Sequence, residues 1–148
     1  MPALVHMVLC ADAIVDSATN RVTLYGVLEE VQVPGEALEQ SLHDKILASG
    51  PIAVYGLLSR EWPTEEPQQP LAVQLRLRMP EADPLDLASI AFEAPLQRTR
   101  VIFRMEGLPL HGAGLYTFEL LQGQDVIGRA PLRVRAADPI PAPPPGHP

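Results

Sequence analysis

Residues 71–79 read LAVQLRLRM, and a large apolar side chain occupies every second position of this stretch. Neighbouring side chains of a β-strand point to opposite faces, so a period of two predicts a strand with one buried face. Leucine, valine and methionine share one face, whereas alanine, glutamine, Arg76 and Arg78 share the other. The stretch therefore predicts a sheet with one face in a hydrophobic core and one in water.

The chain on both sides of this stretch also has the character of strands. Residues 114–135 predict a closing hairpin, because aromatic and apolar residues alternate before the turn at Gln122-Gly123. Pro131 in the return strand predicts a sheet edge or a bulge, since proline has no N–H for the ladder. Further strands are expected at 52–60, 88–93 and 100–106. Residues 3–15 and 21–33 predict a long hairpin at the start of the chain, and its first strand is expected to be central and buried on both faces.

One segment departs from the strand pattern. Residues 35–49 carry Leu38, Leu42 and Ile46 at a spacing of four, with polar residues between them. This spacing predicts an amphipathic helix of about three turns that packs on the sheet. A long acidic loop is the alternative.

The order of these elements indicates the fold class. Seven or eight strands, one short helix and no alternation of strands with helices predict an all-β protein. We expect an antiparallel β-sandwich, Ig-like or C2-like, over residues 1–135, with a closed barrel as the alternative. Residues 136–148 predict a disordered tail, because six of the last ten residues are proline.

Composition restricts the partners and the compartment. The formal net charge is −7, and the acidic excess falls in residues 1–75, so we expect no binding to nucleic acid or to an anionic membrane surface. No segment reaches the roughly 20 apolar residues of a membrane helix. Cys10 is the single cysteine, which excludes an intramolecular disulfide and predicts a reducing compartment, the cytoplasm.

Two stretches resemble a known family. Residues 9–16 (LCADAIVD) with 21–30 (RVTLYGVLEE), and residues 114–134 (GLYTFELLQGQDVIGRAPLRV), are similar to a family of small bacterial and phage-associated proteins known as a domain of unknown function. The resemblance implies a β-sandwich and carries over no catalytic residue. The segment 35–49 departs from the short connection expected of that family.

No pattern of catalytic or metal-binding residues is present. His111, beside two glycines, is the one histidine placed to act as a base, but no nucleophile motif accompanies it, and a turn residue is the default interpretation. Cys10 lies in an apolar strand, where a thiolate is disfavoured. Five aspartates are interpreted as solvated turn residues, with a calcium site as the alternative: Asp12, Asp16, Asp83, Asp86 and Asp125. We expect no catalytic site, cofactor or metal.

The remaining candidates belong to an interaction surface. Trp62 is the only tryptophan and lies in a proline-rich loop. Arg76 and Arg78 share the outer face of one strand, and Arg133 and Arg135 share that of another. These arginines form a basic stripe for an acidic partner or pair internally with Glu93, Glu106 and Glu119.

These observations favour a non-enzymatic protein-interaction or assembly module that contacts a protein partner or a second copy of itself. A sandwich that binds a small ligand, a carbohydrate or Ca²⁺ is the alternative. A polyproline ligand in the tail and a metal-dependent hydrolase are the weaker hypotheses.

Overall fold

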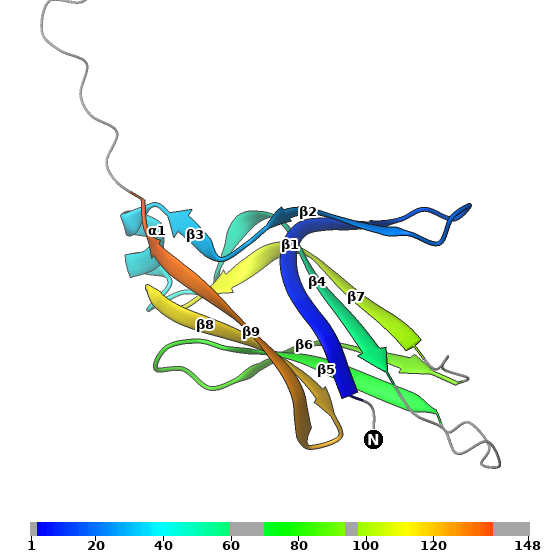
Figure 1. Ribbon diagram of the computed structural model, residues 1–148. Coiled ribbons are helices and arrows are strands. Elements are labelled where there is room, and N and C mark those ends of the chain that lie inside the picture. The colour runs from blue at the N-terminus through cyan, green and yellow to red at the C-terminus, as the bar shows by residue number, and fades with distance from the viewer. Residues whose placement is uncertain (1–2, 60–69, 94–97, 138–148) are drawn as a thin grey trace, which may run out of the picture.

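A computed structural model describes residues 3–59, 70–93 and 98–137. These residues form nine strands in two sheets and one short helix, so the predicted all-β class is confirmed (Figure 1). The first sheet has the order β2-β1-β4-β7, with bounds Val22–Val27, Ala3–Val15, Ile46–Ser59 and Arg98–Leu110. The second has the order β3-β9-β8-β5-β6, with bounds Glu30–Val33, Asp125–Ala136, Gly114–Gln122, Leu71–Arg78 and Leu85–Phe92.

The hydrophobic core lies between the two sheets. Leu9, Val54 and Phe103 contribute from the first sheet, and Leu75 and Phe118 from the second, all at most 4% exposed. Full burial of one such side chain stabilises the fold by about 1.5–3 kcal/mol. The core therefore joins the sheets face to face.

The alternation in 71–79 predicts β5 correctly. Leu71, Val73, Leu75 and Leu77 are at most 1% exposed, and Arg78 on the opposite face is exposed. β6 and β7 are longer than the predicted strands at 88–93 and 100–106. The described part of the chain has nine strands rather than seven or eight.

The closing hairpin is confirmed. β8 and β9 pair antiparallel up to Gln122 and Asp125, and Gly123 occupies the turn with a φ of +60°. The Arg133 N–H donates to the carbonyl oxygen of Glu29, the residue just before the edge strand β3. The backbone nitrogen of Pro131, two residues earlier in β9, points to the same side of the strand as the N–H of Arg133. The pairing of β9 with β3 begins only at Arg133, so β3 does not reach Pro131. Pro131 therefore lacks its N–H on an open edge, as predicted.

The prediction of a single strand over 21–33 is wrong. β2 pairs with β1 from Val22 to Val27, but the chain then leaves the first sheet. The Leu28 N–H donates to Leu9 in β1, whereas Glu29 accepts from the N–H of Arg133 in β9. β3 therefore belongs to the second sheet, where it pairs with β9 as the sheet's one parallel pair among the described strands.

The three-turn helix over 35–49 is also wrong. α1 spans only Gly35–Gln40, and turns follow it to residue 44. Leu38 is buried, but Leu42 is 51% exposed, and Ile46 begins β4 by pairing with Leu110 of β7. Backbone pairing and burial in the sheet thus override the helical spacing of the leucines.

β1 is a central strand, as predicted, because it pairs with both β2 and β4. The prediction that both of its faces are buried is wrong for part of the strand. His6 is exposed and Ile14 is 47% exposed, while Cys10 and Ala13 form a small second cluster with Ala53 on β4. The end of β1 pairs with β2 alone, so it has fewer neighbours to cover it.

The sheets meet along β1 and β9, which lie against each other, and β6 and β7 are the edges on the opposite side. β9 ends at Ala136, one residue past the predicted domain boundary. The predicted tail lies outside the described residues from position 138 onward. Among the described helices, none has the length and apolar character needed to cross a bilayer.

Candidate functional site

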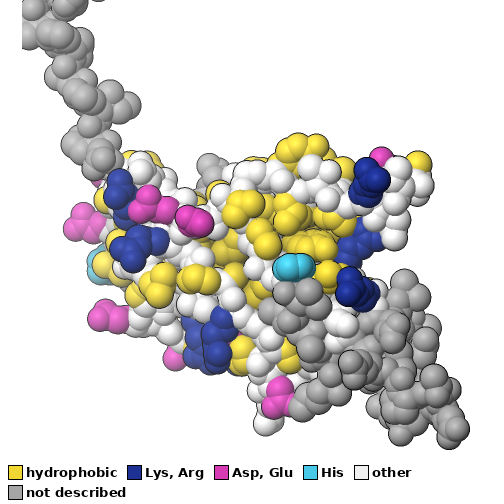
Figure 2. Space-filling model, in the orientation of Figure 1, with side chains coloured by type: hydrophobic (Ala, Val, Ile, Leu, Met, Phe, Trp, Pro, Cys, Tyr) yellow, Lys and Arg dark blue, Asp and Glu magenta, His cyan; other side chains and the backbone are white. Residues whose placement is uncertain are grey.

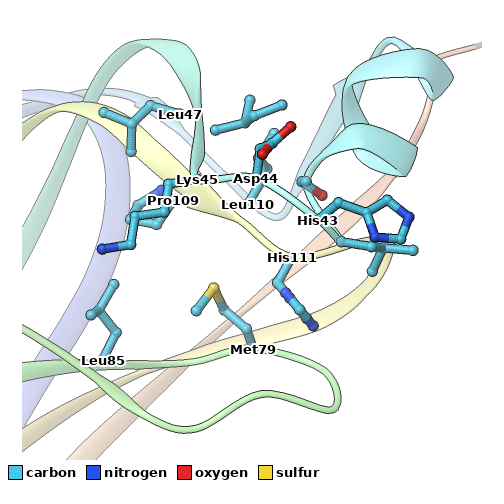
Figure 3. A pocket seen from close by; sticks show the side chains of 12 residues that line it. His43, Asp44, Lys45, Leu47, Met79, Leu85, Pro109, Leu110 and His111 are labelled. Atoms are coloured by element: carbon cyan, nitrogen blue, oxygen red, sulfur yellow. The ribbon is translucent and has the colours of Figure 1, made fainter.

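A pocket of about 490 Å³ opens at one end of the two sheets. Its walls come from four chain segments that are distant in sequence. The side chains that matter most below are Lys45, Leu47, Met79, Leu85, Pro109 and His111. We call this site the end pocket (Figure 3).

Strand ends from both sheets position the end pocket. β4 begins beside the end of β7, where Leu47 pairs with Pro109. In the other sheet β5 ends just before Met79, and Leu85 opens β6 opposite Leu77. Figure 3 shows Leu47 and Pro109 on one side of the opening and Met79 and Leu85 on the other. The pocket therefore lies between the sheets, where their strands stop.

A chain of hydrogen bonds fixes the loops around the pocket. The Tyr116 hydroxyl accepts from the backbone N–H of His111 at 2.6 Å and donates to the carbonyl oxygen of Gly112 at 2.7 Å. The Gly112 N–H donates to Ser41 Oγ at 2.8 Å, and the Ser41 hydroxyl donates to the carbonyl of Leu38 at 2.5 Å. Burial raises the pKa of Tyr116, so its hydroxyl stays protonated at neutral pH. Tyr116 thus ties the turn after β7 to the end of α1.

The lining of the end pocket combines apolar and polar side chains. Its lining is mainly leucine, isoleucine, methionine and proline, and its polar side chains are those of Ser41, His43, Asp44, Lys45 and His111. Ligand sites have this composition, apolar walls with a few polar groups that orient the ligand. His111 lies in the connection between β7 and β8.

The four predicted arginines lie on one face of the second sheet. β5 and β9 are separated by β8 only, and the buried residues of both strands alternate with arginines on the outer face. Arg76 pairs with Asp86 at 2.9 Å, Arg78 with Glu119 at 2.5 Å, and Arg135 with Glu30 at 3.4 Å.

Glu119 is the centre of these ion pairs. Its side chain is 2% exposed and also accepts from Arg129 at 3.1 Å, so one carboxylate links β5, β8 and β9. Pairing with Glu119 was one of the predicted arrangements. The other two predicted acids, Glu93 and Glu106, form no ion pair within the described residues.

The other candidate residues do not converge. Trp62 lies outside the described residues. Asp16 accepts the N–H groups of Ala18 and Thr19, and these bonds lower its pKa. Within the described ranges, no three histidine, cysteine or acidic side chains gather closely enough to hold a metal ion.

Cys10 is completely buried and its thiol points to the carbonyl of Ala53. Burial raises the pKa of this thiol, and the nearby charge of Asp12 raises it further. A raised pKa keeps the sulfur protonated at neutral pH, when it is a poor nucleophile.

β6 is an open edge of the second sheet. Its order in the sheet gives it one hydrogen-bonded neighbour, β5, among the described strands. Asp86 is its one charged residue, and residues 87–92 (LASIAF) contain neither charge nor proline. Ser89 and Ala91 are exposed on the outer face. Natural proteins usually protect such edges with charges or proline, as β7 does with Arg98 and Arg104.

A second apolar surface lies on the hairpin of β1 and β2. Ile14, Val15, Tyr25 and Val27 are 39–61% exposed there. Figure 2 shows hydrophobic side chains gathered over the part of the molecule where β1 and β2 lie. The edge strand β2 is shorter than β6, and Gly26 interrupts it with a φ of +61°. β6 is therefore the longer of these two edge strands, and Asp86 is its one charged residue.

Sequence patterns identified neither the end pocket nor the open edge. The pocket residues come from strand ends and turns, where no periodic pattern applies. The signal for the edge was present, since residues 87–92 lack charge, but strand order cannot be read from the sequence.

A scan against models of protein families finds no match to this chain, and a search of curated proteins finds none either. The roles of individual residues therefore rest on the geometry described above. The resemblance to small bacterial proteins of unknown function stays a prediction.

Proposed function

We propose that this protein is an Ig-like protein-interaction module that binds an extended segment of a protein partner along the open edge of β6. The observation that carries the proposal is this strand, which is eight residues long, mostly exposed and almost free of charge. Extended peptides bind such edges through main-chain hydrogen bonds and gain specificity from alternate side chains.

The strand order supports the Ig-like form of the sandwich over the C2-like form. The neighbours β1-β4-β7 correspond to strands A, B and E of an Ig domain, and β9-β8-β5-β6 to strands G, F, C and C′. Tyr116 stands near the start of β8, where the chain crosses between sheets, and bonds to backbone four residues earlier. Ig-like sandwiches have a tyrosine of this kind at the start of strand F.

Two features distinguish the chain from an antibody domain. Its single cysteine cannot form the disulfide between sheets, which agrees with a reducing compartment such as the cytoplasm. Strand D, which borders strand E in antibody domains, has no counterpart beside β7 among the described strands. Among the described residues, no strand lies beside β6 or β7 on this side of the sandwich, which favours the addition of a strand from a partner.

The outer face of β6 favours a close approach by another chain. Ser89 and Ala91 are small, so a strand laid beside β6 meets no bulky or charged side chain there. Inward-facing Ile90 and Phe92 are half-buried against the core and gain cover from a new neighbour. A bound strand therefore continues the hydrogen-bonded ladder and extends the core.

A matched pair of variants tests the proposal. Ser89 pairs with Gln74 and Ala91 with Ala72, so S89K/A91K and A72K/Q74K add the same charges to the same face one strand apart. The probe is a fluorescent peptide of residues 85–92 flanked by lysines, which presents an edge strand to the whole protein. We expect S89K/A91K to weaken peptide binding at least about tenfold, and A72K/Q74K to change it less than about threefold.

Fluorescence anisotropy gives the peptide affinity, and sedimentation velocity gives the mass of the protein over a range of concentrations. Equal affinity in the two variants contradicts the role of β6. A wild-type protein that stays monomeric and binds no strand peptide contradicts the interaction module itself.

A further inference from the structure

The end pocket gathers exposed leucines from both sheets. Eight large hydrophobic residues are more than a third exposed in the described part of the chain, and three of them line this one pocket. Leu42 is 51%, Leu47 66% and Leu85 40% exposed. Isolated exposed leucines are ordinary, but a group around one concavity marks a surface that a ligand covers.

The floor of the pocket is continuous with the hydrophobic core. Ile46 and Met79 are half-buried and pack against the core cluster, and Leu110 is part of that cluster. An apolar group that enters the pocket therefore meets packed hydrocarbon on its inner side. Met79 is unbranched and adapts its shape to different ligands.

Lys45 gives the pocket its one cationic group. It is the only lysine of the chain, it is exposed, and it forms no ion pair with another described residue. In Figure 3 its ammonium end lies between Leu47 and Leu85, whereas the Asp44 carboxylate points away from Leu85 and Met79. The rim thus offers a cation beside apolar walls.

The frame of the pocket is fixed before a ligand arrives. The hydrogen bonds from Tyr116 to Gly112 and from Gly112 to Ser41 hold the two loops that carry Lys45 and His111. A preformed site loses little conformational entropy on binding.

We propose that the end pocket binds a small amphipathic carboxylate, a monocarboxylic acid with a hydrocarbon body. The hydrocarbon lies between Leu47 and Leu85 above Met79, and the carboxylate accepts from the Lys45 ammonium. The volume of about 490 Å³ falls in the range of small-molecule sites. One cation and mostly apolar walls fit neither a sugar nor a nucleotide, which need many more polar partners. This site shares only Leu85 with the edge strand β6 proposed above as the protein-binding edge.

The experiment titrates the whole protein with hexanoate, octanoate and decanoate, and with octanol as a neutral analogue, by isothermal titration calorimetry. Each added methylene is expected to tighten binding by up to about fourfold, because burial of one methylene is worth about 0.8 kcal/mol. No saturable binding of decanoate overturns the proposal.

Variants assign the two parts of the site. Lys45→Gln is expected to weaken carboxylate binding about three- to tenfold and to leave octanol binding unchanged. Leu47→Ser is expected to weaken both ligands. Arg133→Gln and Leu115→Ser are the matched controls, because both residues are exposed on the outer face of the second sheet. Equal losses in the controls, or none in K45Q, contradict the assignment.

The S89K/A91K variant separates this proposal from the proposed function. Ser89 lies four residues along β6 from Leu85, which is about 13 Å in a strand. Decanoate binding is therefore expected to stay at the wild-type level in this variant. A wild-type protein that binds decanoate but no strand peptide keeps the pocket and refutes the edge, and the reverse result refutes the pocket alone.

Discussion

The hydroxyl of Tyr116 donates a hydrogen bond of 2.7 Å to the carbonyl oxygen of Gly112, four residues earlier in the chain. The oxygen of this Tyr116 hydroxyl also accepts the backbone N–H of His111, so a completely buried side chain satisfies two backbone groups of one turn. Gly112 is itself buried and has a φ of +70°. Among the described residues, no other group forms a hydrogen bond with the His111 N–H or the Gly112 carbonyl.

Tyr116→Phe removes both hydrogen bonds and keeps the ring. We expect the free energy of unfolding to fall by about 1–3 kcal/mol, because a buried carbonyl and N–H lose their partner. Tyr25→Phe is the control, since Tyr25 is 51% exposed, and it should change stability by less than about 0.5 kcal/mol. Urea unfolding measures both, and equal small effects contradict the role of Tyr116.

Glu119→Gln removes the buried charge between Arg78 and Arg129. Both arginine side chains are at least half exposed, so water solvates them after the change, and the loss should be about 1–3 kcal/mol. Glu30→Gln breaks the more exposed pair with Arg135 and should cost about 0–1 kcal/mol. Chemical denaturation compares the two, and the double variant R78Q/E119Q should lose less than the sum of the single changes.

Gly114→Ala tests the approach of β8 to the turn after β5. A Cβ at Gly114 would lie 2.7 Å from Pro80 Cγ, and φ is +145°. Gly50 has a similar φ of +130° and open space around it. We expect Gly50→Ala to cost about 1–3 kcal/mol from backbone strain and Gly114→Ala to cost at least about 1 kcal/mol more. Thermal unfolding measures the difference, and equal costs mean that Pro80 moves freely.

The Cys10 thiol should be protected from thiol–disulfide exchange in the folded protein. It is completely buried, and a raised pKa keeps the thiolate scarce. We expect its reaction with a disulfide reagent at neutral pH to be at least about tenfold slower in buffer than in denaturing urea. Absorbance of the released thiolate follows the rate. A native rate equal to the denatured one contradicts the burial of β1.

Asp16 should make the free energy of unfolding depend on pH in the acidic range. The N–H groups of Ala18 and Thr19 lower its folded pKa below the ordinary value of 3.8. Its contribution is therefore complete above that value and is lost as the pH falls through the folded pKa. Asp16→Asn keeps the turn geometry without a titrating group, so the stability difference between wild type and variant should shrink below about pH 4. Urea midpoints at several pH values test this, and a constant difference refutes it.

The alternation of apolar and polar residues predicted many of the strands correctly, because in these strands the apolar positions are the ones that the sheet buries. The alternate residues from Leu71 to Leu77 and the aromatic side chains at 116 and 118 lie in the core as their patterns indicate. The helix over 35–49 failed for the opposite reason, since the residues from Ile46 pair with β7 whatever their spacing to Leu38. Local patterns do not include this long-range pairing.

The candidate site was less accessible to sequence reasoning. The arginine stripe was found because Arg76, Arg78 and Arg133 obey the alternation of their strands. The end pocket was missed because Leu47 and Leu85 meet only after two sheets have formed and their strand ends align. The burial of Glu119 likewise depends on the strands that flank β8, which the sequence does not order.

The parallel pair of β3 and β9 affects how the chain folds during synthesis. Glu30 pairs with Arg133, so an early segment waits for a partner translated more than a hundred residues later. Contacts of such long range slow folding, because loop closure must precede the gain from pairing. Until β9 leaves the ribosome, β8 and β3 both present unpaired backbone, which favours aggregation of the nascent chain.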